Sequence, residues 1–217
     1  ISQMIRIYPT TFKGNIEAMP SKSHAHRLLV AAALSTTPTT LKNLPECDDI
    51  DTTLECLKEL GCTIERLPDG SVKLHPFPKT SPVPKVELNF KQSGTTAHLL
   101  LPILAALGMD AECKASGTLL KRTLLPLSSR MAIRGIKFSS FNFPLTMTGT
   151  LQPGDYVFAG DEGSQYISGA LMALPLLRSD SEIKLSSPLI DDSYIDITLN
   201  SMKEFGVIAE VTEYGFK

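Results

Sequence analysis

The sequence predicts an α/β domain with pseudo-threefold symmetry, made of three βαβαββ units whose buried first helices run parallel. Three observations lead to this prediction. A short polar segment precedes an apolar helix at intervals of about 71 residues, a second and amphipathic helix then ends at a glycine, and an alternating run follows that glycine. We expect residues 1–217 to form a single domain with repeats at about 14–80, 81–157 and 158–217.

Each unit is expected to begin with a strand that leads directly into the first, apolar helix. The polar starts of these helices are Ser21-Lys22-Ser23, Ser93-Gly94-Thr95 and Ser164-Gln165, and the apolar runs are 28–34, 99–107 and 167–177. A helix that is apolar on nearly all sides is buried on most faces. Three such helices from similar units would bring their N-termini together. Backbone N–H groups and positive helix ends gathered there suit phosphate and carboxylate groups.

The second helix of each unit keeps a charged face and is expected on the outside of the domain. It ends at Gly61, Gly135 or Gly206, as helices do when they close in the left-handed conformation. The first and third units match residue by residue, since 50–54 (IDTTL) aligns with 195–199 (IDITL). The runs 62–65, 136–138 and 207–210 then alternate as half-buried strands do.

The composition narrows the classes of partner and cofactor. A net charge of −2 provides no field that would attract nucleic acid or an anionic membrane. The longest strongly apolar stretch, 99–107, has about half the length of a membrane span. There is no P-loop, dinucleotide fingerprint or HExxH pair. We expect a cytoplasmic protein in which the cysteines are reduced and buried: Cys47, Cys56, Cys62 and Cys113.

Residues 20–27 (PSKSHAHR) combine basic and hydroxyl side chains at a predicted helix start. Lys22 and Ser23 fall at the first turn, and Arg27 lies one turn further along. A lysine charge, a serine hydroxyl and an arginine fork at a helix N-terminus make a good anion clamp. In the alternative interpretation, Ser21 or Ser23 only caps the helix while Lys22 and Arg27 are solvated surface charges. These residues alone leave both interpretations open.

This segment resembles the N-terminal signature of the EPSP synthase family, the 3-phosphoshikimate 1-carboxyvinyltransferases, and the similarity covers essentially the whole chain. The later landmarks follow in the family's order: 93–96 (SGTT), Arg122, 164–169 (SQYISG) and 193–199 (SYIDITL). The resemblance implies the inside-out α/β barrel of this family. The related transferases that act on UDP-N-acetylglucosamine share that fold but lack the Ser-Lys-Ser plus Arg signature, so they rank second. A non-catalytic binding paralogue is a further alternative.

The resemblance implies a transferase that moves the enolpyruvyl group from phosphoenolpyruvate to the 5-hydroxyl of shikimate 3-phosphate, in aromatic amino acid biosynthesis. It also implies that this reaction needs no metal or organic cofactor. Lys22, Ser23 and Arg27 would contact shikimate 3-phosphate, and Lys22, as the shared catalytic contact, would also reach phosphoenolpyruvate. The backbone of Gly94 would approach phosphoenolpyruvate closely, and Arg122 would pair with the anionic groups of that ligand. The remaining implied contacts to shikimate 3-phosphate are Ser164, Gln165 and Tyr194.

Several positions depart from the family pattern. His98 stands where an arginine is usual, Gly163 replaces a serine, Asp191 replaces a ligand-contacting serine, and Thr123 replaces the proline after Arg122. A carboxylate near a phosphate would repel it. The resemblance implies that the principal acid and base lie in a second, C-terminal domain, which we expect to be absent from this chain. We therefore expect a substrate-binding half that binds shikimate 3-phosphate weakly and does not turn over alone.

Overall fold

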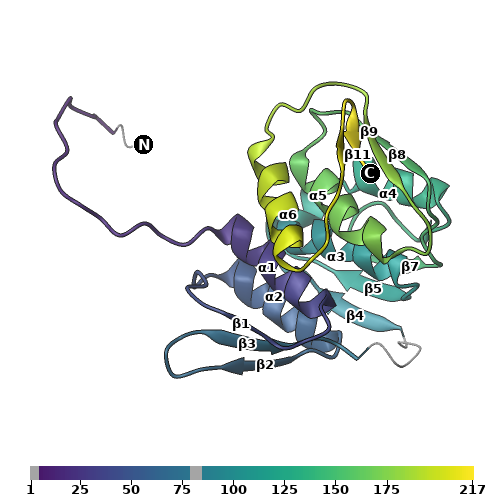
Figure 1. Cartoon of the computed structure of the whole chain (residues 1–217), viewed down its shortest axis with the longest axis horizontal. Coiled ribbons are helices and arrows are strands. Elements are labelled where there is room, and N and C mark those ends of the chain that lie inside the picture. The colour runs from purple at the N-terminus through teal and green to yellow at the C-terminus, as the bar shows by residue number, and fades with distance from the viewer. Residues whose placement is uncertain (1–4, 79–84) are drawn as a thin grey trace.

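The computed structural model describes residues 5–78 and 85–217 (Figure 1). The expected boundary between the first two repeats, near residue 80, lies outside these ranges. Three separate sheets surround a central group of helices, and each sheet is built from one third of the chain. None of the helices that the structure describes has both the length and the apolar character needed to cross a membrane.

The first sheet has the strand order β1-β3-β2 and is antiparallel throughout. Its part of the chain contains α1 (Lys22–Leu34), β1 (Thr39–Leu41), α2 (Asp48–Glu59), β2 (Thr63–Arg66) and β3 (Val72–His75).

The second sheet has four strands in the order β4-β5-β7-β6, with β4 parallel to β5 and the other pairs antiparallel. Its elements are β4 (Val86–Asn89), α3 (Gly94–Ala106), β5 (Ala111–Lys114), the 3-10 helix η1 (Gly117–Lys121), α4 (Leu125–Ile133), β6 (Lys137–Phe138) and β7 (Leu145–Thr148).

The third sheet repeats this arrangement in the order β8-β9-β11-β10, again with a parallel first pair. Its elements are β8 (Asp155–Phe158), α5 (Ser164–Ala173), the 3-10 helix η2 (Leu174–Leu176), β9 (Glu182–Leu185), α6 (Ser193–Glu204), β10 (Val211–Thr212) and β11 (Gly215–Phe216).

The glycines that close the second helices have the predicted conformation. Gly61, Gly135 and Gly206 follow α2, α4 and α6 with φ angles of 98°, 100° and 80°. These angles lie in the region that side chains with a Cβ rarely adopt. The helix ends were therefore correctly predicted from the sequence.

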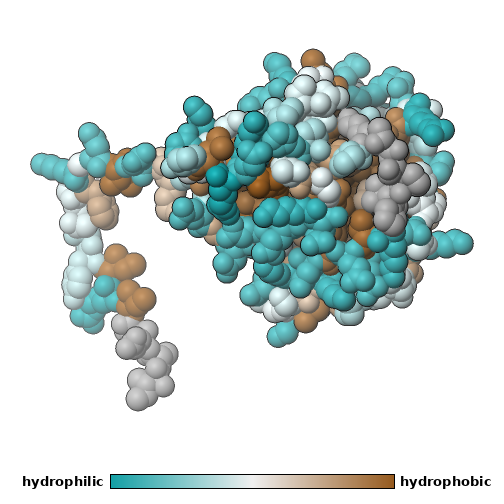
Figure 2. All heavy atoms as spheres, turned by 90° about the horizontal axis from the view of Figure 1, so that it is seen from below, coloured by the Kyte–Doolittle hydropathy of each residue, from teal (hydrophilic) through white to brown (hydrophobic). Residues whose placement is uncertain are grey.

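The strand expected before the first helix is wrong for the part of the chain that the structure describes. Residues 5–20 form no strand, although β4 and β8 occupy the corresponding place in the other two sheets. In Figure 1 this segment extends away from the body, and Figure 2 shows brown apolar side chains along it. Ile16, for example, is 95% exposed. The reason is that no described residue lies beside the segment to pair with its backbone or cover its apolar side chains.

The strand expected at 207–210 is also wrong, because β10 begins only at Val211. The backbones of Glu210 and Lys217 are hydrogen bonded to each other in both directions, with N···O distances of 2.6 and 2.8 Å. Regular strand pairing is thus confined to the short hairpin of β10 and β11, which Glu210 and Lys217 close. Residues 207–209 instead line a cavity.

The centre of the domain is formed by α1, α3 and α5 (Figure 1). All but one of the thirteen residues of α3 are buried, which confirms the prediction of an apolar helix enclosed on most sides. The helices α3 and α5 approach each other closely at Gly169, where an added Cβ would lie 2.1 Å from the carbonyl oxygen of His98. That carbonyl lacks its helical partner because Pro102, four residues on, has no N–H. A glycine and a proline together therefore permit this close helix contact.

Candidate anion site at the helix N-termini

Lys22 is the first residue of α1 and is held by α2. Its Nζ lies 2.6 Å from Oδ2 of Asp49, and half of its side chain is exposed. The hydrogen bond that Lys22 donates to Asp49 raises the pKa of Lys22, so the amine is charged at neutral pH. Ser21 caps the helix, since its Oγ accepts from the backbone N–H of His24 at 3.2 Å. The lysine charge is thus positioned at a capped helix start, with one carboxylate already beside it.

Arg27 is buried, with only 1% of its surface exposed. Its Nε donates to Thr198 Oγ1 at 2.5 Å, and its terminal nitrogens donate to the carbonyl of Ser23 at 2.8 Å and to Ser168 Oγ at 2.9 Å. Burial lowers its pKa to about 10, which still leaves it charged at neutral pH. The interpretation of Arg27 as a solvated surface charge is therefore wrong. Two of its five N–H donors remain for other partners.

The residue before Arg27 anchors α1 on its other side. His26 Nδ1 lies 2.8 Å from Thr53 Oγ1 of α2, which lies 2.7 Å from Thr96 Oγ1 of α3, and Thr96 Oγ1 lies 2.6 Å from Ser93 Oγ. All four side chains are buried. Neighbouring residues of α1 thus bind it to α2 and α3 on one side and to α5 and α6 on the other. These bonds tie the N-terminal halves of the three central helices together.

Gly94, the first residue of α3, lies directly beside the guanidinium of Arg122. An added Cβ at Gly94 would be 3.2 Å from a terminal nitrogen of Arg122 and 3.8 Å from Cε1 of His98. Arg122 is exposed, and within residues 5–78 and 85–217 no carboxylate forms an ion pair with it. A charged group without a counter-ion therefore lies over the positive end of a helix, an arrangement suited to an anionic ligand.

His98 connects α3 to the first turn of α5. Its Nδ1 lies 2.7 Å from Oε1 of Gln165, whose Nε2 donates to Thr95 Oγ1 at 3.1 Å. Its ring packs edge-on against Tyr166, with 4.7 Å between ring centroids. Burial lowers the pKa of His98, so the ring is neutral at neutral pH. Where the family usually has arginine, this chain has a neutral group that holds a neighbouring site residue.

Two other departures also take part in defined structure. Gly163, before α5, has a φ of 121°, which a serine would adopt only with strain. Asp191 accepts hydrogen bonds from the backbone N–H and the hydroxyl of Ser193, the first residue of α6. Ser164 is the half-buried first residue of α5, and Tyr194 is 40% exposed at the start of α6. Tyr194 lies close enough to Lys22 and Arg27 to influence the pKa of both.

Some residues of this region were not identified from the sequence. Asp49 is the partner of Lys22, while the buried hydroxyls of Thr53, Thr198 and Ser168 hold α1 in place. One signal was available, because Thr53 and Thr198 occupy the same position of the repeat. Both are polar residues on the buried face of an amphipathic helix.

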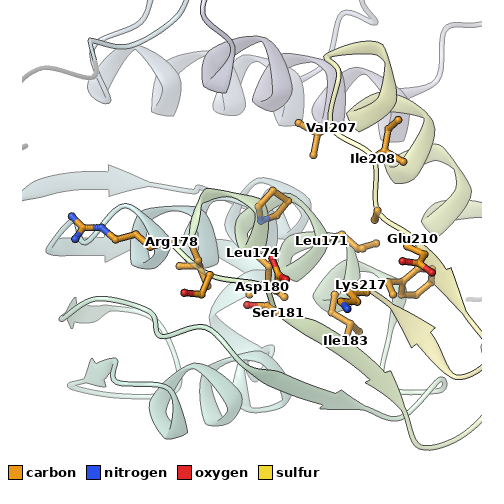
Figure 3. A pocket seen from close by; sticks show the side chains of 15 residues that line it. Leu171, Leu174, Arg178, Asp180, Ser181, Ile183, Val207, Ile208, Glu210 and Lys217 are labelled. Carbon is orange, nitrogen blue, oxygen red and sulfur yellow. The ribbon is translucent and has the colours of Figure 1, made fainter.

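A cavity of about 480 Å³ lies at the other end of α5 (Figure 3). Leu171 and Leu174 line it together with Val207 and Ile208. None of its lining residues belongs to the first turns of α1, α3 or α5, so the cavity is separate from the candidate anion site.

A second hollow, of about 740 Å³, lies between the start of α1 and the outer face of α6. Its walls contain none of the predicted ligand contacts. They are formed by Ser21, His24, Ile197, Asn200, Lys203 and Glu204. Among the residues that the structure describes, no cluster of three or more metal-ligating side chains is placed to hold a metal ion.

Comparison with known proteins identifies the family. The family model described as EPSP synthase (3-phosphoshikimate 1-carboxyvinyltransferase) matches residues 8–216. A protein of that name from Clostridium kluyveri is 36% identical over 217 residues, covering 97% of this chain and 49% of the relative. One from Saccharolobus solfataricus is 34% identical and covers 99% of this chain and 49% of the relative. The chain thus spans about half the length of these relatives.

The fold is also found in a solved structure. EPSP synthase from Acinetobacter baumannii superposes with a TM-score of 0.79 at 22% sequence identity, over 94% of this chain and 46% of that one. At this identity the match supports the fold, while the family rests on the sequence comparisons. Since the relatives carry the name of the shikimate enzyme, they favour it over the UDP-N-acetylglucosamine alternative. The chain belongs to the EPSP synthase family.

Proposed function

We propose that this chain is the half of an enolpyruvyl transferase that binds shikimate 3-phosphate and one side of phosphoenolpyruvate. The observation that supports the proposal is that each central helix begins with groups suited to an anion. Lys22 begins α1, Arg122 lies beside Gly94 at the start of α3, and Gln165 lies in the first turn of α5. The names of the relatives supply the substrates, since both ligands of a 3-phosphoshikimate 1-carboxyvinyltransferase are anionic. Helix N-termini with nearby cations are well suited to such groups.

In the proposed reaction the 5-hydroxyl of shikimate 3-phosphate attacks C2 of phosphoenolpyruvate while C3 takes up a proton. The proton of the attacking hydroxyl passes to a general base. The tetrahedral adduct then loses phosphate from C2 and a proton from C3 to give the enolpyruvyl ether. This chain's contribution is to hold two anions side by side, because Lys22 and Arg122 offset their mutual repulsion. Lys22 would divide its hydrogen bonds between Asp49 and the ligand, since an ammonium group has three donors.

The general acid and base are proposed to come from the remainder of the enzyme. His26 and His98 are buried, and burial lowers the pKa of both, to about 4 for His26. An imidazole whose pKa is lowered is unprotonated at neutral pH and so does not serve as a proton donor there. The chain alone is therefore expected to bind shikimate 3-phosphate without forming product.

The non-catalytic alternative rested on three departures from the family pattern: His98, Gly163 and Asp191. Each now has a defined local role, as a partner of Gln165, as a residue with positive φ, and as an acceptor at the start of α6. These contacts favour a working site with altered supporting residues.

The test is calorimetric titration of the chain with shikimate 3-phosphate at moderate salt. Lys22→Ala should weaken binding by about 10- to 100-fold, because it removes a hydrogen bond to a charged group. Lys85→Ala is the matched control, since Lys85 forms an equally exposed ion pair with Glu112 at 2.9 Å, away from the helix N-termini. Absence of binding at millimolar ligand by a folded chain, or equal effects of the two variants, would contradict the proposal.

A further inference from the structure

We propose that His98 is a positioning residue that sets the orientation of the Gln165 carboxamide, so that a free N–H rather than the carbonyl oxygen faces the anion site. The contact between His98 and Gln165 is independent of any ligand. Its consequence for ligand affinity rests on the function proposed above. The inference gives a role to the histidine that replaces the family's arginine.

Both ends of the Gln165 carboxamide are held. Its Oε1 lies 2.7 Å from His98 Nδ1 of α3, and its Nε2 donates to Thr95 Oγ1 at 3.1 Å. The amide nitrogen carries two hydrogens, so one of them remains after the bond to Thr95. Gln165 is half-buried in the first turn of α5, so part of the residue remains accessible to a ligand.

The tautomer of His98 decides which way the carboxamide points. Its Nε2 is buried and has no hydrogen-bond partner among residues 5–78 and 85–217. A neutral imidazole carries its proton on one nitrogen only, and a buried N–H without an acceptor is rarer than an unpaired acceptor. The proton therefore resides on Nδ1, which donates to Oε1 of Gln165. A rotated carboxamide would require the proton on Nε2, where nothing accepts it.

The ring of His98 is fixed from several sides. It is only 5% exposed and packs edge-on against Tyr166. The backbone of His98 is pressed against Gly169 of α5. Burial and the nearby charge of Arg122 lower the pKa of the His98 imidazole, whereas the hydrogen bond to Gln165 raises it. The lowering effects prevail and keep the ring neutral. The imidazole thus has one position and one protonation state in which to hold its partner.

The orientation of the carboxamide sets the sign of its interaction with an anion. An N–H directed at a phosphate or carboxylate oxygen attracts it, whereas a carbonyl oxygen in the same place repels it. A hydrogen bond to a charged acceptor corresponds to about tenfold or more in affinity. His98 should therefore affect ligand binding although its own ring is not exposed to the ligand.

The tautomer can be observed without any ligand. Long-range ¹H–¹⁵N correlation spectra of the ¹⁵N-histidine-labelled chain should show His98 protonated on Nδ1 and unprotonated on Nε2. The resonance is assigned by its loss in His98→Asn, and His26 in the same spectrum provides a second buried histidine whose Nε2 has no partner. Protonation of His98 on Nε2 would overturn the inference, even if shikimate 3-phosphate bound as proposed.

The effect on affinity is measured by titration with shikimate 3-phosphate. His98→Phe keeps a ring beside Tyr166 but removes the donor, and should weaken binding about tenfold. His98→Asn places an amide N–H near the position of Nδ1 and should restore affinity to within about threefold. Tyr166→Phe is the control, since it removes only the hydrogen bond from the tyrosine hydroxyl to the carbonyl of Thr123. It should leave affinity unchanged.

A double-mutant cycle separates positioning from a purely structural effect. If His98 acts through Gln165, His98→Phe should change affinity by less than about twofold in a Gln165→Ala background. An equal loss in both backgrounds would overturn the inference. If the wild-type chain binds no shikimate 3-phosphate, the proposed function fails for this chain, and the tautomer measurement alone decides the role of His98. The same measurement decides it if His98→Phe does not fold.

Discussion

Replacing Gly169 by alanine should destabilise the protein, although the same change stabilises most helices. In an ordinary helix interior, alanine is favoured over glycine by about 1 kcal/mol. Here the new Cβ would lie 2.1 Å from the carbonyl oxygen of His98 and 3.1 Å from Cγ of Pro102. Such an approach to a backbone oxygen is not tolerated, so α3 and α5 would have to separate by about 1 Å at this point.

The expected magnitude follows from these opposing effects. Overpacking a well-packed core typically costs about 1–3 kcal/mol, and more when the obstructing atom belongs to the backbone. After the gain in helix propensity, the free energy of unfolding should fall by about 2 kcal/mol. For a domain of this size that lowers Tm by about 4–8 °C. Because His98 and Gln165 lie on the two separating helices, affinity for shikimate 3-phosphate should fall as well.

Chemical and thermal unfolding followed by circular dichroism would measure the effect. Gly94→Ala serves as the control, because the nearest atom to its Cβ would be the flexible tip of Arg122, at 3.2 Å, and the others would lie at ordinary contact distance. It should leave Tm unchanged or slightly raised. A Gly169→Ala chain as stable as the wild type would show that the two helices are not in close backbone contact, and would refute the reasoning.

Three further outcomes are expected. Gly94→Ala should weaken binding of phosphoenolpyruvate about tenfold in calorimetry with shikimate 3-phosphate present, because the methyl group takes space beside Arg122; unchanged affinity would place that ligand elsewhere. Burial lowers the pKa of His26 to about 4, so the unfolded chain binds this proton more tightly than the folded one. The contribution of His26 to the free energy of unfolding, on the order of 3 kcal/mol, is fully present above about pH 6.5 and is lost as the pH falls towards 4. If the stability of His26→Gln changed with pH as steeply as that of the wild type, this expectation would be contradicted. Among the thiols, half-buried Cys47 should react first with Ellman's reagent. Cys56 should react slowly, because burial raises the pKa of its thiol to about 12. Fast reaction of the buried thiols in the native state would argue against this packing.

The sequence determined the parts of this protein that depend on local pattern. Apolar runs predicted the central helices, and Gly61, Gly135 and Gly206 predicted where the second helices close. The signature at 20–27 and its later landmarks led to the family to which the chain belongs. Hydrophobic period and turn chemistry act over a few residues, so one sequence suffices to identify them.

Only the tertiary structure decided which polar groups meet. Arg27 and its acceptor Thr198 are 171 residues apart in the chain, and His98 and Gln165 are 67 apart. Neither pair has a local signal, because a buried polar side chain must find its partner on whichever element packs against it. The missing first strand of unit one has the same origin. A strand forms where a neighbouring edge can pair with it and an apolar surface can cover it, and both conditions depend on the three-dimensional arrangement of the chain.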